Sequence, residues 1–178
     1  IFGGGFDPSV HDAENTFDAA GDSVGNALYI VNAYSGALIW SASDDLLDGE
    51  KVSNSDMKWS VPSSPSVVDL DFDGLVDHIY VSDLGGQIFR VDINNNSTTA
   101  DDRAYRGKTF AKLGISGGLA SQNVLNNRKF FAAPVVGSND LGTGYVLQIA
   151  IGSGNRDFPL NEDTDDRLFV LNDEEVRS

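Results

Sequence analysis

The segment that most constrains the fold is an acidic nonapeptide, residues 69–77, with the sequence DLDFDGLVD. Aspartates stand at its first, third, fifth and ninth positions, and a glycine stands at the sixth. Carboxylates crowded into one tight loop repel each other unless a cation binds between them, and Ca²⁺ tolerates several oxygen ligands in flexible geometry. The glycine permits the sharp reversal that a Cβ atom would hinder. The predicted ligands are Asp69, Asp71, Asp73, the carbonyl oxygen of Leu75, and Asp77.

The residues on either side of this loop predict two strands rather than the helices of an EF-hand. Residues 65–68 (PSVV) and 78–81 (HIYV) are rich in β-branched and aromatic side chains. The position of the bidentate glutamate of an EF-hand is occupied by Tyr80, so we expect a dissociation constant on the order of 10⁻⁴ to 10⁻³ M. Such a site fills where Ca²⁺ is millimolar, which indicates an extracellular location. The alternative is a solvated acidic turn that binds no ion.

Composition limits the other possibilities. The chain has 178 residues, enough for one domain with a core, and a hydrophobic content of 40% rules out general disorder. The net charge of −15, with only 12 Lys and Arg, argues against partners such as nucleic acid or an anionic membrane. No apolar run approaches about 18 residues, so we expect no membrane insertion. The absence of cysteine excludes disulfides and thiolate chemistry.

The spacing of strand-like segments predicts an all-β fold with an internal repeat. Turn residues alternate with short runs of strand character, and one pattern of aliphatic, aromatic and then Asn or Asp residues recurs. It occupies residues 27–32, 87–92 and 167–172, and it follows a second strand type at residues 1–6, 79–83 and 149–154. A third strand type, at residues 65–68 and 134–137, comes earlier still.

About three copies of one four-stranded antiparallel unit are therefore expected, and such units are blades of a β-propeller. The near-continuous apolar runs of the inner strands are typical of blades that neighbours cover on both faces. Propellers need about four to eight blades, so residues 1–178 are expected to form one partial propeller. The start at Ile1, without Met, likewise indicates a piece of a longer protein. Long acidic loops are expected at residues 7–24 and 155–166.

Four segments of the chain resemble the quinoprotein-like C-terminal propeller of the PilY/PilC family, the type IV pilus tip-associated biogenesis factors and adhesins. The segments are residues 25–40, 62–92, 134–136 with 149–154, and 167–172. The resemblance implies that the five ligands named above bind Ca²⁺, and that Ca²⁺ controls pilus extension, retraction and surface attachment. It also implies a location at the pilus tip, associated with the bacterial outer membrane. The implied partners are minor pilins and host or surface ligands, and we expect no catalysis.

Two other classes of protein share parts of this pattern. Residues 30–40 resemble the tryptophan-docking motif of pyrroloquinoline-quinone dehydrogenases, with Asn32 and Ser35 in place of the usual Asp and Thr. That motif is structural, and it predicts that Trp40 packs between blades. An integrin-α-like propeller carries the acidic loop in several blades, but the equivalent loop at residues 138–144 has a single carboxylate.

Three remaining features have structural interpretations, and a fourth is a weaker candidate for a second cation site. His11 and His78 stand apart from other metal ligands and are expected to be surface or packing residues. Asn94–Asn96 is expected to form an exposed turn. Residues 3–5 and 152–154 are glycine-rich without a following helix, which favours close backbone packing over phosphate binding. A candidate second cation site consists of Asp163, Asp165 and Asp166.

Overall fold

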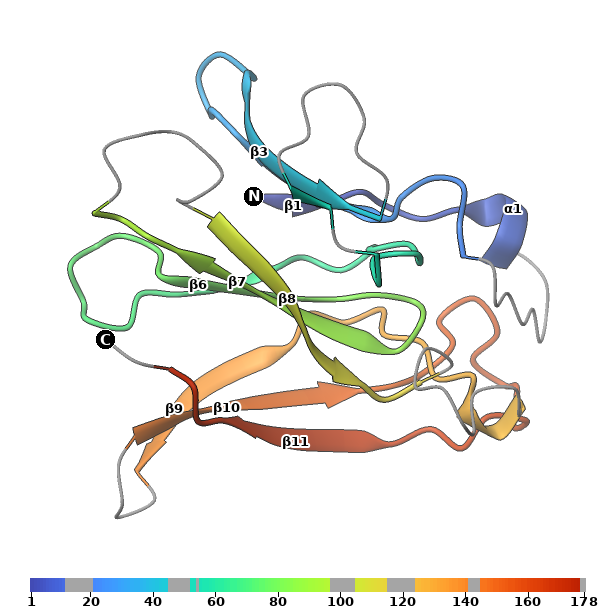
Figure 1. Cartoon of the computed structure of the whole chain (residues 1–178). Helices are drawn as coiled ribbons and strands as arrows, with labels where there is room; N and C mark the ends of the chain where they lie inside the picture. Colours follow the sequence, from blue (N-terminus) through green and yellow to red (C-terminus); the bar gives the residue numbers. More distant parts are fainter. Residues whose placement is uncertain are drawn as a thin grey trace.

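The structure, a computed structural model, describes residues 1–11, 21–44, 52–53, 55–96, 105–114, 124–140 and 145–176. Strands dominate these residues, and the helical elements among them are the single turns α1 (Pro8–His11) and η2 (Val124–Asn126). Figure 1 shows three twisted sheets stacked in chain order, from the N-terminal sheet in blue to the C-terminal sheet in red. The predicted all-β, three-blade organisation is confirmed.

The first sheet has the order β1-β2-β3-β4. It consists of β1 (Phe2–Gly3), β2 (Ala27–Val31), β3 (Leu38–Ser43) and β4 (Val52–Ser53). The pairs β1–β2 and β2–β3 are antiparallel, but β4 runs parallel to β3, with Ala42 opposite Val52. This pairing departs from the antiparallel blade that the repeat predicts. Parallel neighbours need a crossover instead of a hairpin, and the crossing residues 45–51 lie outside the described residues.

The second and third sheets are antiparallel throughout the described residues. The second contains β5 (Ser66–Val68), β6 (His78–Ser82), β7 (Gln87–Ile93) and β8 (Tyr105–Lys112). The third contains β9 (Val135–Asp140), β10 (Tyr145–Gly152) and β11 (Leu168–Asp173), three strands where four were expected. The three repeat segments form β2, β7 and β11, and each pairs with the strand before it, as the alignment of the repeats predicts.

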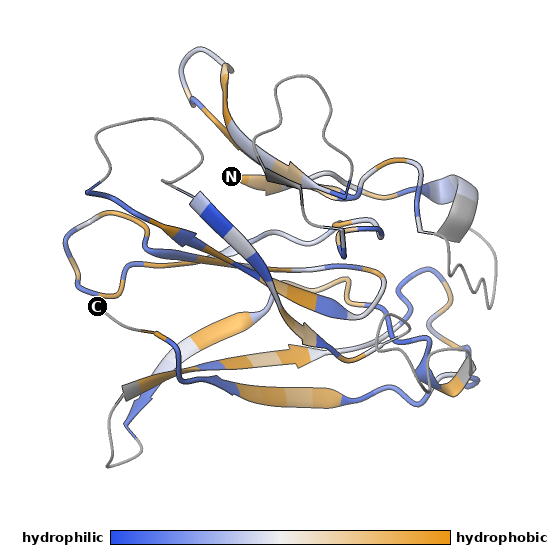
Figure 2. Ribbon diagram, viewed as in Figure 1, coloured by the Kyte–Doolittle hydropathy of each residue, from blue (hydrophilic) through white to orange (hydrophobic). Residues whose placement is uncertain are grey.

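Two clusters of buried side chains join the three sheets. The first cluster fills the seam between the first and second sheets and includes Trp40, Ile79 and Val81. The second fills the seam between the second and third sheets and includes Tyr80 and Ile149. Successive residues of β6 thus face opposite seams, and all five residues of that strand are buried. Figure 2 shows the hydrophobic residues gathered on the strands, which agrees with a middle blade covered on both faces.

The tryptophan-docking segment behaves as predicted. Trp40 is fully buried, and its ring lies 5.4 Å from that of Tyr105 on β8, at an interplanar angle of 30°. The turn before β3 is held by Asn32, whose Oδ1 accepts hydrogen bonds from the backbone N–H groups of Tyr34 and Ser35 at 2.9 and 3.0 Å. An asparagine therefore fulfils the role of the usual aspartate, because the turn needs only an acceptor.

The two glycine-rich segments differ in what surrounds them. A Cβ atom on Gly3 would lie 2.3 Å from the carbonyl oxygen of Val61, and Gly4 is similarly enclosed, so close backbone packing is confirmed there. The same prediction is wrong for Gly152 and Gly154, where no described atom lies within 4 Å of the Cβ position. The reason is their location beside a cavity at the end of β10 instead of between two backbones.

Candidate metal centre

The acidic loop connects β5 to β6 at one end of the second sheet, as predicted. The N–H of Asp77 donates to the carbonyl oxygen of Val68 at 2.8 Å, which closes the base of the loop. The carbonyl oxygen of Asp77 accepts from the N–H of Ile93 at 2.8 Å, which ties the same residue to the end of β7. The loop thus rises from two paired strands and is anchored to a third.

The backbone of the loop reverses at two left-handed residues. Gly74 has a φ of +91°, which confirms the role predicted for this glycine. Phe72 also has a positive φ, of 62°, and it is the non-glycine residue with this conformation in the described part of the chain. Sequence patterns missed this feature, because a bulky side chain rarely adopts it. Phe72 is 90% exposed, so packing against the described residues does little to compensate for the strain.

Three of the predicted ligands converge. One carboxylate oxygen from each of Asp69, Asp71 and Asp77 lies within 4.8 Å of the others. Backbone donors contact all three side chains: Asp69 accepts from the N–H of Gly74 at 2.9 Å, Asp71 from the N–H of Asp73 at 3.2 Å, and Asp77 from the N–H of Leu70 at 2.7 Å. Three carboxylates on one loop, two of them partly exposed and that of Asp71 exposed, form a candidate site for a hard divalent cation, since such ions prefer oxygen ligands.

The other two predicted ligands lie outside this trio. The carboxylate of Asp73 accepts a hydrogen bond on Oδ1 from the N–H of Leu75 at 2.7 Å. Leu75 is half exposed, and its carbonyl oxygen stays a predicted ligand. Ca²⁺ needs about six to eight oxygens, so the converging trio leaves room for both residues and for water.

A residue that the sequence pattern did not indicate supports the site from a different turn. The side-chain amide of Asn95 donates to Oδ1 of Asp77 at 3.1 Å and to the carbonyl oxygen of Val76 at 3.3 Å. The run of three asparagines from 94 to 96 does form the predicted turn after β7. No local signal could have linked it to the acidic loop, because the contact depends on the pairing of β6 with β7.

A polar groove of about 560 Å³ is bordered by the acidic loop and the turn after β7, and its lining includes Asp71, Asp77, His78, Arg90 and Asp92. His78 is buried, and its Nδ1 lies 2.8 Å from Oδ1 of Asp92, which confirms its role as a packing residue. Burial raises the pKa of Asp92, but hydrogen bonds from His78 and Arg90 lower it by more, so the carboxyl has a depressed pKa. The side chain of His11 lies outside the described residues.

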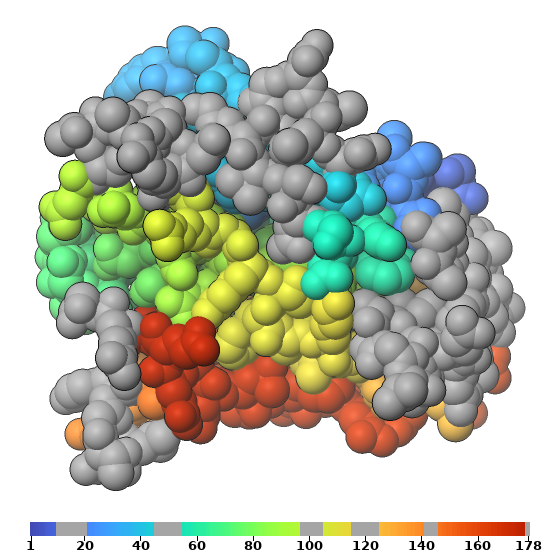
Figure 3. Space-filling view, viewed as in Figure 1, coloured from blue at the N-terminus to red at the C-terminus, as the bar shows by residue number. Residues whose placement is uncertain are grey.

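The same groove ends at a buried polar network between the second and third sheets. Asp173, at the end of β11, accepts from the hydroxyl of Tyr80 and from Nη1 of Arg90, both at 2.7 Å. Burial and the adjacent Asp173 raise the pKa of Tyr80 far above its usual range. Lys108 of β8 also pairs with Glu175 beyond β11. Figure 3 shows these C-terminal residues, in red, lying against the yellow strand β8.

Protein donors contact all three acids of the candidate second cation site, of which Asp163 accepts from the side-chain amide of Asn161 at 3.3 Å. Asp165 pairs with Arg167 and lies 3.5 Å from Nη2 of Arg128. Asp166 accepts from the hydroxyl of Ser153 at 2.7 Å. Within the described residues, the converging group of potential metal ligands is the trio in the acidic loop. Of the loop at residues 138–144, the described part belongs to β9.

These features define a class of protein: a segment of a β-propeller with an acidic loop between the first two strands of one blade. Among solved structures, the chain is similar to the C-terminal domain of PilY1 from Pseudomonas aeruginosa, with a TM-score of 0.52 and 21% sequence identity. The similarity covers 84% of this chain and 31% of that chain, so this chain spans about a third of its length. No protein-family model and no curated protein matches the sequence. No helix among the described residues is long and apolar enough to cross a membrane.

Proposed function

We propose that this chain is a Ca²⁺-binding propeller segment of a type IV pilus-associated surface protein. The observation that carries the proposal is the convergence of Asp69, Asp71 and Asp77 on a loop whose neighbouring strands have the expected pairing. In this proposal the carboxylate of Asp73 and the carbonyl oxygen of Leu75 complete the ligand set. The chain binds and does not catalyse.

The bound ion acts by electrostatics. Three carboxylates held within 4.8 Å of one another repel, and a divalent cation converts this repulsion into attraction. The ion thereby ties the end of β5 to the start of β6 through Asp69 and Asp77. Because it binds the folded loop and not the unfolded chain, it stabilises the folded state by mass action. Release of the ion loosens this end of the blade.

The pilus assignment rests on the family resemblance of residues 62–92 and on the structural similarity to the PilY1 domain. In this context the partners are minor pilins and host or surface ligands, and the location is the bacterial surface at the pilus tip. The ordered and loosened states of the loop would then control pilus extension, retraction and attachment. A Ca²⁺ affinity in the range of extracellular modules suits that location.

Calorimetric titration of the chelated chain with CaCl₂ tests the metal site. We expect one site with a dissociation constant of about 10⁻⁴ to 10⁻³ M and thermal stabilisation that grows with Ca²⁺ concentration. Asp77→Ala removes a converging carboxylate and should abolish both effects. Glu162→Ala is the matched control, because it removes an exposed acid outside the loop. Equal stabilisation of wild type and Asp77→Ala by Ca²⁺ would show that the site is wrongly assigned.

A further inference from the structure

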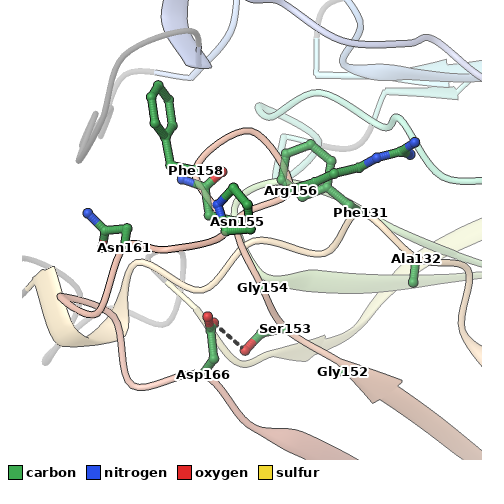
Figure 4. Close-up of a pocket in the computed structure, with 11 residues that line it drawn as sticks. Phe131, Ala132, Gly152, Ser153, Gly154, Asn155, Arg156, Phe158, Asn161 and Asp166 are labelled. Carbon is green, nitrogen blue, oxygen red and sulfur yellow. Dashed lines mark hydrogen bonds between the residues drawn. The ribbon is translucent and has the colours of Figure 1, made fainter.

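The third sheet carries a second cavity, remote from the acidic loop. The acidic loop precedes β6, whereas this cavity follows β10, the strand that corresponds to β6 in the repeat. The loops at residues 69–77 and 155–166 accordingly lie at opposite ends of the strands in Figure 1. The cavity has a volume of about 330 Å³ and is lined by residues 131–132, the end of β10 and the loop that follows. Figure 4 shows its lining residues.

The two glycines of the cavity leave the backbone at its wall open. Neither Gly152 nor Gly154 has a positive φ, and no described atom lies within 4 Å of the position of a Cβ. Neither backbone conformation nor packing among the described residues therefore requires glycine. At a cavity, such glycines allow another molecule to approach the backbone closely.

The side chains around these glycines combine aromatic rings with polar groups. Phe131 and Phe158 supply the rings, and the ring of Phe131 is held by Phe6, with centroids 6.1 Å apart. In Figure 4, Phe158 and Arg156 extend from the loop to either side of Asn155. Aromatic walls with a few polar groups are typical of sites for small organic ligands.

Both hydrogen-bond donors and acceptors line the cavity. Arg156 is exposed and has no ion-pair partner among the described residues, so its guanidinium donors are available. Asn155 accepts a backbone hydrogen bond through Oδ1, and its Nδ2 makes no bond within the described chain. Asp166 supplies carboxylate oxygens, one of which accepts from Ser153. The charges of Arg156 and Asp166 oppose each other, so this lining selects no net charge.

We propose that this cavity binds a single neutral pyranose unit of a glycan. A pyranose has an apolar ring face that packs against an aromatic side chain, and its hydroxyl groups both donate and accept hydrogen bonds. The open backbone at Gly152 and Gly154 lets the ring approach closely. A cavity of about 330 Å³ accommodates one ring instead of an extended chain. The site is independent of the metal, because no residue is shared between the two.

Backbone amide chemical shifts of the intact chain test this assignment. The probes are the methyl glycosides of glucose, galactose and mannose, with the acyclic polyol sorbitol as the comparison. We expect saturable shifts with at least one glycoside, confined to residues 131–132 and 152–166, with a dissociation constant of about 1 mM. Sorbitol should produce none, because it has no ring to pack. Chelation with EDTA, which empties the metal site, should leave this titration unchanged.

A matched pair of substitutions separates the cavity from the fold. Gly154→Val fills the cavity and should weaken binding by about tenfold or more, which corresponds to about 1.4 kcal/mol. Gly137→Val adds the same side chain at a β9 glycine that also has no neighbour within 4 Å, and it should leave affinity within about twofold. Arg156→Gln, an exposed change, should weaken binding severalfold without altering the rest of the spectrum. The proposal is overturned by the absence of saturable shifts with all three glycosides, by equal shifts with sorbitol, or by undiminished binding to Gly154→Val.

Discussion

The seam between the first and second sheets is apolar, whereas the seam between the second and third sheets contains a buried ion pair. In the first seam, the ring of Trp40 packs at a tilt against that of Tyr105 within a cluster of hydrophobic side chains. The second seam has its own apolar cluster, but Asp173 enters it and pairs with Arg90 at 2.7 Å, with both side chains almost fully buried. Two interfaces between similar sheets thus use different chemistry.

The difference shows how the middle blade can combine a rigid seam on one face with a charge-sensitive seam on the other. Apolar burial is non-directional and does not depend on ionisation, so the first seam tolerates changes in pH and salt. A buried ion pair holds only while both partners remain charged and aligned. The second seam borders the groove beside the acidic loop, and Arg90 lines that groove. We therefore expect the charge state of the loop to affect the second seam more than the first.

The largest expected effect on the free energy of unfolding comes from removing the Trp40 ring in the apolar seam. Trp40→Ala should lower the free energy of unfolding by about 4 kcal/mol, because it removes a fully buried aromatic side chain and leaves a cavity. Trp40→Phe should cost much less, since it keeps a ring against Tyr105 and also removes a buried indole N–H that has no partner among the described residues. Urea denaturation of both variants provides the measurement. Equal losses for the two would show that ring packing is not what holds this seam.

Breaking the ion pair is expected to have the next largest effect. Asp173→Ala should destabilise the chain by about 3 kcal/mol, because it leaves the buried charge of Arg90 without one of its carboxylates. The control Tyr80→Phe removes only a neutral donor to the same oxygen and should cost about 1 kcal/mol. Loss of Asp173 should also weaken Ca²⁺ binding, whereas Trp40→Phe should not. Unchanged Ca²⁺ affinity in Asp173→Ala would contradict the link between the second seam and the loop.

The smallest expected effect, when it is taken per pH unit, is a slope of stability against pH measured after chelation. Burial raises the pKa of Asp83, in the β6–β7 hairpin, to about 8. Between pH of about 4 and 8 the folded state holds this proton and the unfolded state has released it, so stability falls with rising pH by at most about 1.4 kcal/mol per unit. Asp7 contributes outside this window: its pKa is lowered to about 2, chiefly by the hydroxyl of Ser9, so its contribution is lost below pH of about 4.

Asp83→Asn should remove the slope between pH of about 4 and 8, because the new side chain does not titrate. It keeps an acceptor for the N–H of Gln87, which donates to Oδ1 of Asp83 at 2.8 Å. The unpaired Oε1 of Gln87 can accept from the new amide if the Gln87 side chain turns over. Urea denaturation at several pH values measures the effect. A slope that persists in Asp83→Asn would assign it to another group.

Much of the fold follows from local patterns. The repeat at residues 27–32, 87–92 and 167–172 identified three equivalent strands, because each blade needs the same alternation of side chains toward its two seams. The parallel pairing of β4 was not predictable, since it depends on a crossover and not on the strand itself. The open space at Gly154 was also not predicted. A glycine in a sequence does not show whether another backbone packs against it or whether the space beside it is empty.

The sequence by itself determined the three blades, the turn at Gly74 and the gathering of acids in one loop, because each depends on residues close together along the chain. The tertiary structure decided which acids converge, that Asn95 supports Asp77, and that Asp173 meets Arg90 across 83 residues. The structure also shows the carboxylate of Asp73 accepting a hydrogen bond from the N–H of Leu75, outside the converging trio. The physical reason is that local patterns specify strands and turns, whereas the partners of a side chain depend on how the sheets pack.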